Sequence, residues 1–142
     1  MSDKPTLIGM AHGNGGRGSA LMPGERGSGT GSADRLLGIS GMTRDEYLAN
    51  FRRLNLLPFG HWCPIKARVR GLRIQRSLRG TVIVLGKETW RALGLPRVNF
   101  FERVQTELAE FVLLPHPSGR NLIYNYPRNR ERARRILRRA AR

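Results

Sequence analysis

Short apolar runs alternate with longer amphipathic segments along the chain. Thr6–Met10 and Leu54–Leu57 are too short for helices, and Thr81–Gly86 is a continuous run rich in β-branched residues. A fourth run, Glu110–Leu114, stops at a proline. Short apolar stretches bounded by Gly or Pro are typical of strands buried on both faces. The pattern therefore predicts four buried strands.

Helical patterns occupy several of the intervening segments. Thr43 and Glu46 have the spacing of a capping box, which predicts a helix from Thr43 to about Arg52. A second helix is expected between Ile65 and Leu78, with an imperfect apolar face and with Gly71 weakening it. The apolar positions assigned to that face are Val69, Leu72, Ile74 and Leu78.

Two more helices follow the third and fourth runs. Lys87–Leu93 is expected to be helical and to end at Gly94, since glycine commonly closes a helix. Pro127 is expected to open a last, arginine-rich helix over residues 127–142. Its apolar stripe, expected to dock on the sheet, consists of Ala133, Ile136, Leu137 and Ala140.

The alternation of strands and helices predicts the fold class. We expect a three-layer α/β/α sandwich with a central, mostly parallel, four-stranded sheet. The chain has 142 residues, which fits one domain spanning residues 1–142. Residues 12–32, rich in glycine, are predicted to form a loop beside the functional site. This loop is not a nucleotide-binding P-loop, because no Gly-Lys-Ser/Thr closes it.

The charge of the chain indicates a polyanionic partner. Lys and Arg number 26 against 10 Asp and Glu, a net charge of +16. Eight arginines lie in residues 128–142 with Glu131 as the single acid there, so that segment contributes +7 and the remainder +9. Such an excess attracts nucleic acid, although an arginine-rich helix can also be a solvated face. DNA is the partner we expect.

The remaining composition excludes other classes. Cys63 is the single cysteine, which excludes internal disulfides and a multi-cysteine metal cluster. No apolar run has the roughly 20 residues of a membrane span, and the polar start of the chain lacks the apolar segment of a signal peptide. We expect a cytoplasmic monomer, independent of membranes, that needs no cofactor and no metal.

Polar residues follow three of the predicted strands. They are His12 to Asn14 after the first strand, Asn55 with His61 at the second, and His116 to Arg120 after the fourth. In open parallel sheets, ligands bind beyond the carboxyl ends of the strands. These residues are therefore expected to meet at one edge of the sheet.

The same residues resemble the motifs of the uracil-DNA glycosylase superfamily. Members carry Gly-x-(Asp, Asn, Glu or Ala)-Pro-Gly after the first strand, an asparagine in a middle strand that reads the base, and a late His-Pro-Ser motif. The corresponding segments here are 9–13 (GMAHG), 53–58 (RLNLLP, with Asn55) and 116–119 (HPSG). Their order and spacing match over nearly the whole chain.

The resemblance implies roles for individual residues. His116 would donate a hydrogen bond to the base as negative charge builds on it; the alternative is that it only fixes its loop. Asn55 would read the edge of a pyrimidine; the alternative is that it caps a strand end. Ser118, Gly119 and Arg120 would contact DNA phosphates, as would Arg17 in the glycine-rich loop, although Pro and Gly are equally usual in plain turns.

The chain departs from the superfamily pattern around the first motif. Met10 and Ala11 stand where relatives have a water-activating Asp, Asn or Glu, and His12 replaces the motif proline. His12 and Asn14 are the nearby polar groups that could activate or orient water, or they could only shape the loop. Gly9, Met10, Ala11 and Met22 are expected to line the base pocket. The stacking aromatic of relatives is missing, with Leu21 and Met22 in that region, which predicts a softer and wider pocket.

The resemblance implies a DNA glycosylase. Such an enzyme hydrolyses the N-glycosidic bond of a flipped pyrimidine and leaves an abasic site. The softer pocket favours a modified or bulky pyrimidine over uracil, in DNA repair or in defence against modified phage DNA. One alternative is a non-catalytic DNA-binding protein of the same fold that recognises modified bases. A second is a basic RNA-associated or ribosomal protein, which explains the charge but not the motifs.

Overall fold

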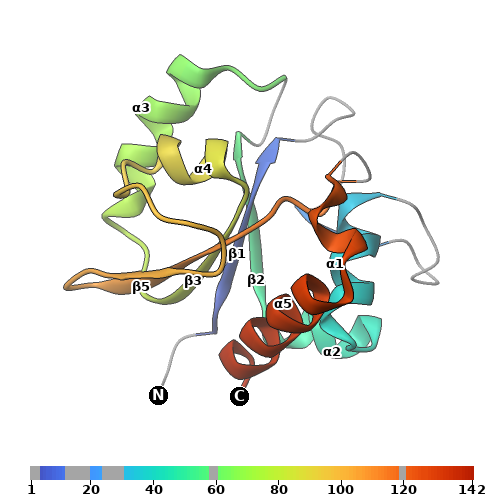
Figure 1. Ribbon diagram of the computed structural model, residues 1–142. Helices are drawn as coiled ribbons and strands as arrows, with labels where there is room; N and C mark the ends of the chain where they lie inside the picture. The colour runs from blue at the N-terminus through green and yellow to red at the C-terminus, as the bar shows by residue number, and fades with distance from the viewer. Residues whose placement is uncertain (1–3, 12–19, 24–30, 58–60, 119–120) are drawn as a thin grey trace.

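The computed structural model describes residues 4–11, 20–23, 31–57, 61–118 and 121–142. A sheet with helices on both faces forms the molecule (Figure 1). Its strands are β1 (Thr6–Ala11), β2 (Arg52–Leu57), β3 (Gly80–Leu85), β4 (Arg103–Gln105) and β5 (Ala109–Leu114). Its helices are α1 (Ser32–Ser40), α2 (Arg44–Asn50), α3 (Pro64–Gln75), α4 (Lys87–Ala92), the 3₁₀ helix η1 (Leu122–Asn125) and α5 (Pro127–Ala140).

The strand order among the described residues is β2-β1-β3-β5-β4. The first four strands in that order are parallel, and β4 alone is antiparallel to its neighbour β5. In the register of the central pair, Ile8 lies opposite Val84. The carboxyl ends of β2, β1, β3 and β5 therefore lie at one edge of the sheet, which confirms the predicted mostly parallel arrangement.

The two faces of the sheet bury separate hydrophobic clusters. On one face, Val82 and Val84 pack with Trp90 and Leu93 of the α4 region and with Ala67 of α3. On the other face, the side chains come from β1, β3, β5, α1, α2 and α5: Leu7, Ile83, Leu85, Leu114, Leu36, Leu37, Ile39, Tyr47, Ala133 and Leu137 among others. Alternate residues of each strand thus pack in opposite hydrophobic clusters, because successive side chains of a strand point to opposite faces of the sheet.

The sheet contains one strand more than the sequence pattern predicts. β4 pairs with β5 through Arg103 opposite Val112 and Val104 opposite Phe111. The connecting turn is closed by Thr106, whose backbone N–H donates to the carbonyl oxygen of Ala109 at 2.9 Å. The prediction of four strands was wrong because β4 has three residues, of which Arg103 and Gln105 are exposed, and so carries no apolar run.

Helix α1 was also missed, whereas the capping box of α2 is confirmed. The side chain of Thr43 accepts from the backbone N–H of Glu46 at 3.1 Å, and Glu46 accepts from that of Thr43 at 3.0 Å. Phe51, rather than Arg52, closes the helix, and Arg52 already belongs to β2. α1 buries Leu36 and Ile39. It directly follows glycine-rich sequence, and for that reason the apolar pattern of this short segment was not recognised as a helix.

Helix α3 lies where predicted, but only two of the four positions assigned to its apolar face are correct: Ile74, and Leu78 just after the helix, pack in the core. Val69 and Leu72 are 59% and 42% exposed, whereas Ala67 and Gly71 are buried. A Cβ on Gly71 would stand 2.2 Å from the carbonyl oxygen of Ala92 in α4. The glycine that weakens the isolated helix is therefore what allows close approach of α3 to α4, and small residues rather than large ones form the contact.

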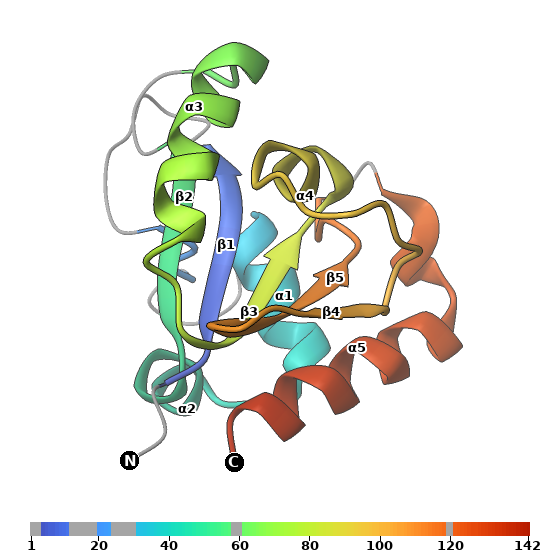
Figure 2. The ribbon, with the colours of Figure 1, turned by 90° about the vertical axis from the view of Figure 1, so that its left-hand side faces the viewer.

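The last two predicted helices are confirmed. α4 ends before Gly94, which adopts a left-handed φ of 74°. In α5, Ala133 and Leu137 are fully buried against the sheet layer and Ile136 and Ala140 are half-buried. α5 ends at the amino edge of the sheet, near the start of β1 (Figure 2).

Candidate functional site

Two of the predicted site residues approach the middle of the carboxyl edge from opposite sides. Asn55 lies on β2, and His116 lies two residues beyond the end of β5. The strands β1 and β3 separate β2 from β5. Adjacent strands are about 4.8 Å apart, so the backbones of β2 and β5 are about 14 Å from one another. Both side chains shorten this gap, as their contacts show.

The side chain of Asn55 reaches over β1. Gly9 is its partner in the register of β1 and β2. A Cβ on Gly9 would stand 2.7 Å from Oδ1 of Asn55 and 3.2 Å from Cδ2 of Leu21. Asn55 is 6% exposed, and no hydrogen bond between described residues uses its amide. The missing side chain of Gly9 therefore makes room for a buried amide whose donor and acceptor are free of described partners.

Leu21 is held in a strained conformation beside that amide. Its φ is 50°, a left-handed value that bulky residues rarely adopt. The hydroxyl of Tyr47 donates to the carbonyl oxygen of Leu21 at 3.0 Å. Burial raises the pKa of Tyr47, so that hydroxyl stays protonated and able to donate. Strain that is imposed by a buried partner is a common feature of ligand sites.

His116 lies over the end of β3. A Cβ on Gly86 would stand 3.4 Å from Cβ of His116, and Gly86 has a φ of 97°, which suits glycine. Burial lowers the pKa of the His116 imidazole, and the nearby Glu88 partly opposes that effect. The imidazole is therefore neutral near pH 7, with one nitrogen that donates and one that accepts. Since Ile8 lies opposite Val84, Gly9 and Gly86 lie one and two residues further along neighbouring strands.

The segment after the His-Pro-Ser loop supports the backbone of that loop. Nδ2 of Asn121 donates to the carbonyl oxygen of His116 at 3.0 Å, and the hydroxyl of Tyr124 donates to that of Pro115 at 2.8 Å. Oδ1 of Asn121 also accepts from the backbone N–H of Ile123 at 3.2 Å and so caps η1. Two consecutive carbonyl groups at the end of β5 are thus fixed by side chains of η1 and its cap.

The other described candidates occupy different positions. Met10 is half-buried on β1, and Ala11 is the last residue of that strand. Met22 is 37% exposed, and its Sδ lies 3.7 Å from guanidinium nitrogens of both Arg44 and Arg53. Ser118 is half-buried, and its carbonyl oxygen accepts from the backbone N–H of Asn121 at 3.1 Å. His61 is exposed.

Five candidates lie outside the described residues. They are His12, Asn14, Arg17, Gly119 and Arg120. The structure therefore brings Gly9, Asn55 and His116 toward one another but leaves the two candidates for water activation, and the predicted phosphate contacts of Arg17, Gly119 and Arg120, untested.

Three residues of the site escaped the sequence analysis, whereas Leu21 had been placed in the region of the missing aromatic. Gly86 gave no signal, because its contact with His116 joins segments far apart in the chain. Asn121 did carry a signal, since an asparagine before a short apolar segment commonly caps a turn or helix. Tyr124 sits in that apolar segment, where its buried hydroxyl required a partner.

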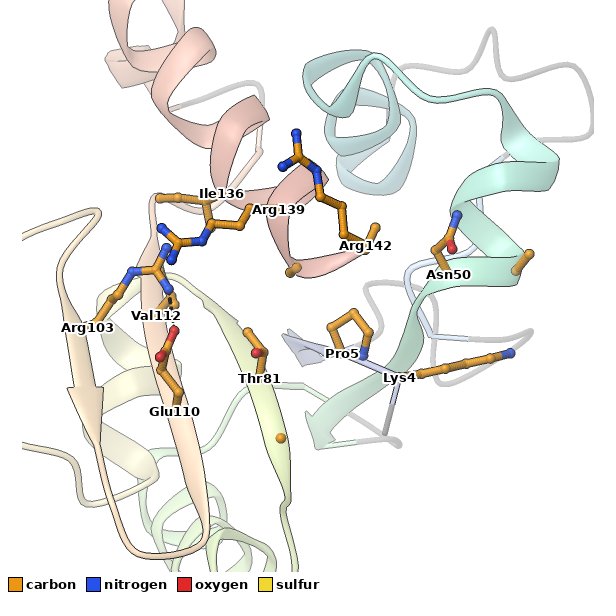
Figure 3. Close-up of a pocket in the computed structure, with 14 residues that line it drawn as sticks. Lys4, Pro5, Asn50, Thr81, Arg103, Glu110, Val112, Ile136, Arg139 and Arg142 are labelled. Carbon is orange, nitrogen blue, oxygen red and sulfur yellow. Dashed lines mark hydrogen bonds and ion pairs between the residues drawn. The ribbon is translucent and has the colours of Figure 1, made fainter. Parts of the chain in front are cut away.

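A cavity elsewhere does not coincide with these residues. It measures about 520 Å³ and lies at the amino edge of the sheet, where Pro5, Thr81 and Glu110 line it together with the end of α5 (Figure 3). None of the predicted site residues lines it. The arrangement at the carboxyl edge is preferred as the candidate site because it combines a half-buried imidazole with a buried amide that has no hydrogen-bond partner among the described residues.

The described residues contain neither a metal-binding cluster nor a membrane-spanning helix. Within the described residues there is no group of three or more His, Cys, Asp or Glu side chains that could hold a metal ion. No described helix is long and apolar enough to cross a membrane. No protein-family model and no curated protein matches the chain.

Proposed function

We propose that the protein is a DNA glycosylase that removes a pyrimidine base flipped out of the DNA stack. The observation that carries this proposal is the placement of Asn55 over Gly9 and of His116 over Gly86, on neighbouring strands at the carboxyl edge. A buried amide and a neutral imidazole at the same edge of the sheet are suited to a neutral, planar ligand with hydrogen-bonding edges. The resemblance of segments 53–58 and 116–119 to uracil-DNA glycosylase motifs supports the same conclusion, and the proposal includes the fold of that superfamily.

In the proposed reaction the bond between C1′ of the sugar and the base breaks. Water adds its oxygen to C1′, and its proton goes to the departing base. Asn55 reads the base edge with one donor and one acceptor. His116 donates a hydrogen bond to the base oxygen as negative charge accumulates there, an interaction that strengthens in the transition state. Activation of the water is assigned to His12 or Asn14.

The side chain beside Asn55 supports a modified or bulky pyrimidine as the substrate. Leu21 lies beside Asn55 where an aromatic ring would stack on a base in related enzymes. An aliphatic side chain leaves more space above the base plane than a ring does. The proposed settings are DNA repair and defence against modified phage DNA.

One observation favours a second candidate function. The last two residues of β1, Met10 and Ala11, provide no carboxylate or amide to activate water beside Asn55. A DNA-binding protein that recognises modified bases without cleaving them needs only hydrogen bonds from the Asn55 amide and the His116 imidazole, together with a basic surface. This candidate differs from the first in a single measurable respect, the release of a base.

The deciding experiment is a base-release assay. The protein is incubated with labelled oligonucleotides that contain uracil, hydroxymethylated pyrimidines or glucosylated pyrimidines, and abasic sites are then cleaved with alkali. Shortened strands from at least one substrate are the expected result. Selective binding to one modified base without any shortened strand would establish the non-catalytic candidate instead.

A further inference from the structure

The arginines of α5 fall into two groups with different surroundings. The first group donates hydrogen bonds to backbone carbonyl oxygens of α1, its C-terminal cap and η1. Arg134 and Arg138 thereby satisfy the carbonyl groups that the end of a helix leaves free. The contacts are Arg130 to Tyr124 at 2.7 Å, Arg134 to Ile39 at 3.1 Å, and Arg138 to Ser40 at 3.2 Å and to Gly41 at 2.9 Å. These arginines hold α5 in place.

The second group, here called the outer stripe, faces solvent. Its members are spaced by four, three and four residues, which places them on one side of a helix with 3.6 residues per turn. That side is opposite the buried Leu137. The outer stripe consists of Arg128, Arg132, Arg135 and Arg139, all exposed.

Little in the described structure neutralises the outer stripe. Arg135 forms an exposed ion pair with Glu131 at 3.3 Å. Arg132 stacks on the ring of Phe101 at 4.3 Å, a contact that leaves its charge in place. Arg128 and Arg139 have no carboxylate within ion-pair distance among the described residues, and Arg139 points toward Arg103, whose charge is already paired with Glu110 (Figure 3). Like charges gathered in this way repel one another and attract an anion.

We propose that the outer stripe of α5 binds the sugar-phosphate backbone of DNA. From Arg128 to Arg139 the helix rises about 17 Å. Each strand of duplex DNA carries one phosphate per roughly 3.4 Å of axis, so the stripe spans several phosphates. α5 begins just after η1, which supports the His116 loop, and ends at the amino edge. The DNA would therefore run from the base pocket along α5. The inference rests on the proposed partner, DNA, and not on base release.

The form of the stripe favours DNA over an acidic protein. Protein interfaces are anchored by buried aromatic or aliphatic side chains surrounded by polar ones. On the outer stripe the charges recur at regular intervals, and the apolar residues of α5 face inward. Arginines that recur at regular intervals along a helix can each reach a phosphate, which a guanidinium group binds with two hydrogen bonds.

The test compares two variants with the same change in charge. The first carries Arg128→Gln, Arg135→Gln and Arg139→Gln, which spares the three arginines that anchor α5. The control carries Lys66→Gln, Arg73→Gln and Arg76→Gln, three exposed cations on or next to α3, across the sheet from α5. Binding to a short unmodified DNA duplex is measured by fluorescence anisotropy over a range of salt concentrations. Circular dichroism checks that both variants fold.

The test measures the slope of the logarithm of the DNA-association constant against the logarithm of the salt concentration. Each phosphate contact contributes about 0.9 to that slope, so the α5 variant is expected to lose about 2 to 3 units and the control almost none. Equal losses in both variants, or an unchanged slope in the α5 variant, would overturn the proposal. If the triple variant does not fold, the single changes Arg128→Gln and Arg139→Gln are each expected to lower the slope by about 0.9. Unmodified DNA keeps this result separate from that of the base-release assay.

Discussion

Oδ1 of Asn55 lies 2.7 Å from the point that a Cβ on Gly9 would occupy. The two residues face each other across β1 and β2, and the amide takes the space that any other residue at position 9 would fill. The glycine of the first motif and the asparagine of the second therefore act as one unit. Their coupling can be tested without knowing the substrate.

Gly9→Ala is expected to displace the amide of Asn55 and to destabilise the protein by about 1 to 3 kcal/mol, as overpacked substitutions do. Adding Asn55→Ala should recover part of that loss, because the second change removes the clashing atom. Urea unfolding of the two single variants and the double variant gives the coupling energy. Gly38→Ala is the control, since nothing lies within 4 Å of its added Cβ. Strict additivity would show that the two residues do not interact.

Asn55→Asp is expected to change base preference rather than abolish binding. An ionised carboxylate accepts hydrogen bonds but cannot donate, so selectivity should move toward bases with an exocyclic amine. Competition between modified oligonucleotides in the base-release or binding assay measures the shift. Asn125→Asp, an exposed change of the same chemistry, should leave preference unaltered. Identical preference in the Asn55 variant and wild type would mark Asn55 as a structural residue.

His116→Ala is expected to slow base release while leaving DNA affinity almost unchanged. Loss of one donor of this kind costs about 2.7 to 4 kcal/mol in the transition state, a factor of roughly 100 to 1000 in rate. Single-turnover kinetics and anisotropy separate the two effects. His61→Ala serves as the control because His61 is exposed. A variant that cleaves at the wild-type rate would remove His116 from the mechanism and make His12 the next residue to change.

Burial of His116 also predicts how stability varies with pH. Burial holds the pKa of the His116 imidazole below its ordinary value of about 6.5, so below that pH the unfolded chain binds a proton that the folded protein resists. Stability contributed by the neutral imidazole is thus present above pH 6.5 and lost as pH falls toward the folded pKa, by at most about 1.4 kcal/mol per pH unit. Urea unfolding between neutral and mildly acidic pH measures how the free energy of unfolding changes with pH, and His116→Asn is the comparison. If the free energy of unfolding of that variant changes with pH as steeply as that of wild type, other groups cause the effect.

Tyr124→Phe is expected to destabilise the protein by about 1 to 2 kcal/mol, because it leaves the carbonyl oxygen of Pro115 without its donor. Tyr126→Phe is the matched control, since Tyr126 is 67% exposed. If η1 also positions His116, the Tyr124 variant should lose rate at saturating substrate with little change in KM. Thermal unfolding and steady-state kinetics give both quantities. Equal stability of the two variants would show that the buried hydroxyl contributes nothing.

Local chemistry explains which parts of the fold the sequence predicted. Continuous apolar runs identified the four parallel strands, because a strand buried on both faces must be apolar along its length. The capping box of Thr43 and Glu46 and the glycine at position 94 fixed helix ends through contacts a few residues apart. β4 was missed because an edge strand of three residues draws its stability from pairing with β5 rather than from its own composition.

Contacts between distant segments were decided only in three dimensions. The face of α3 depends on how closely the backbone at Gly71 can approach Ala92, and the hydrophobic pattern therefore misplaced Val69 and Leu72, which are exposed. The strand pattern placed Asn55 in the second half of β2 and His116 just after the end of β5, and the structure confirms both positions. That Asn55 reaches over Gly9, that Tyr47 holds Leu21 beside it, and that η1 supports His116 follow from side-chain packing across the sheet. Such packing depends on the arrangement of all the layers together, which no local pattern encodes.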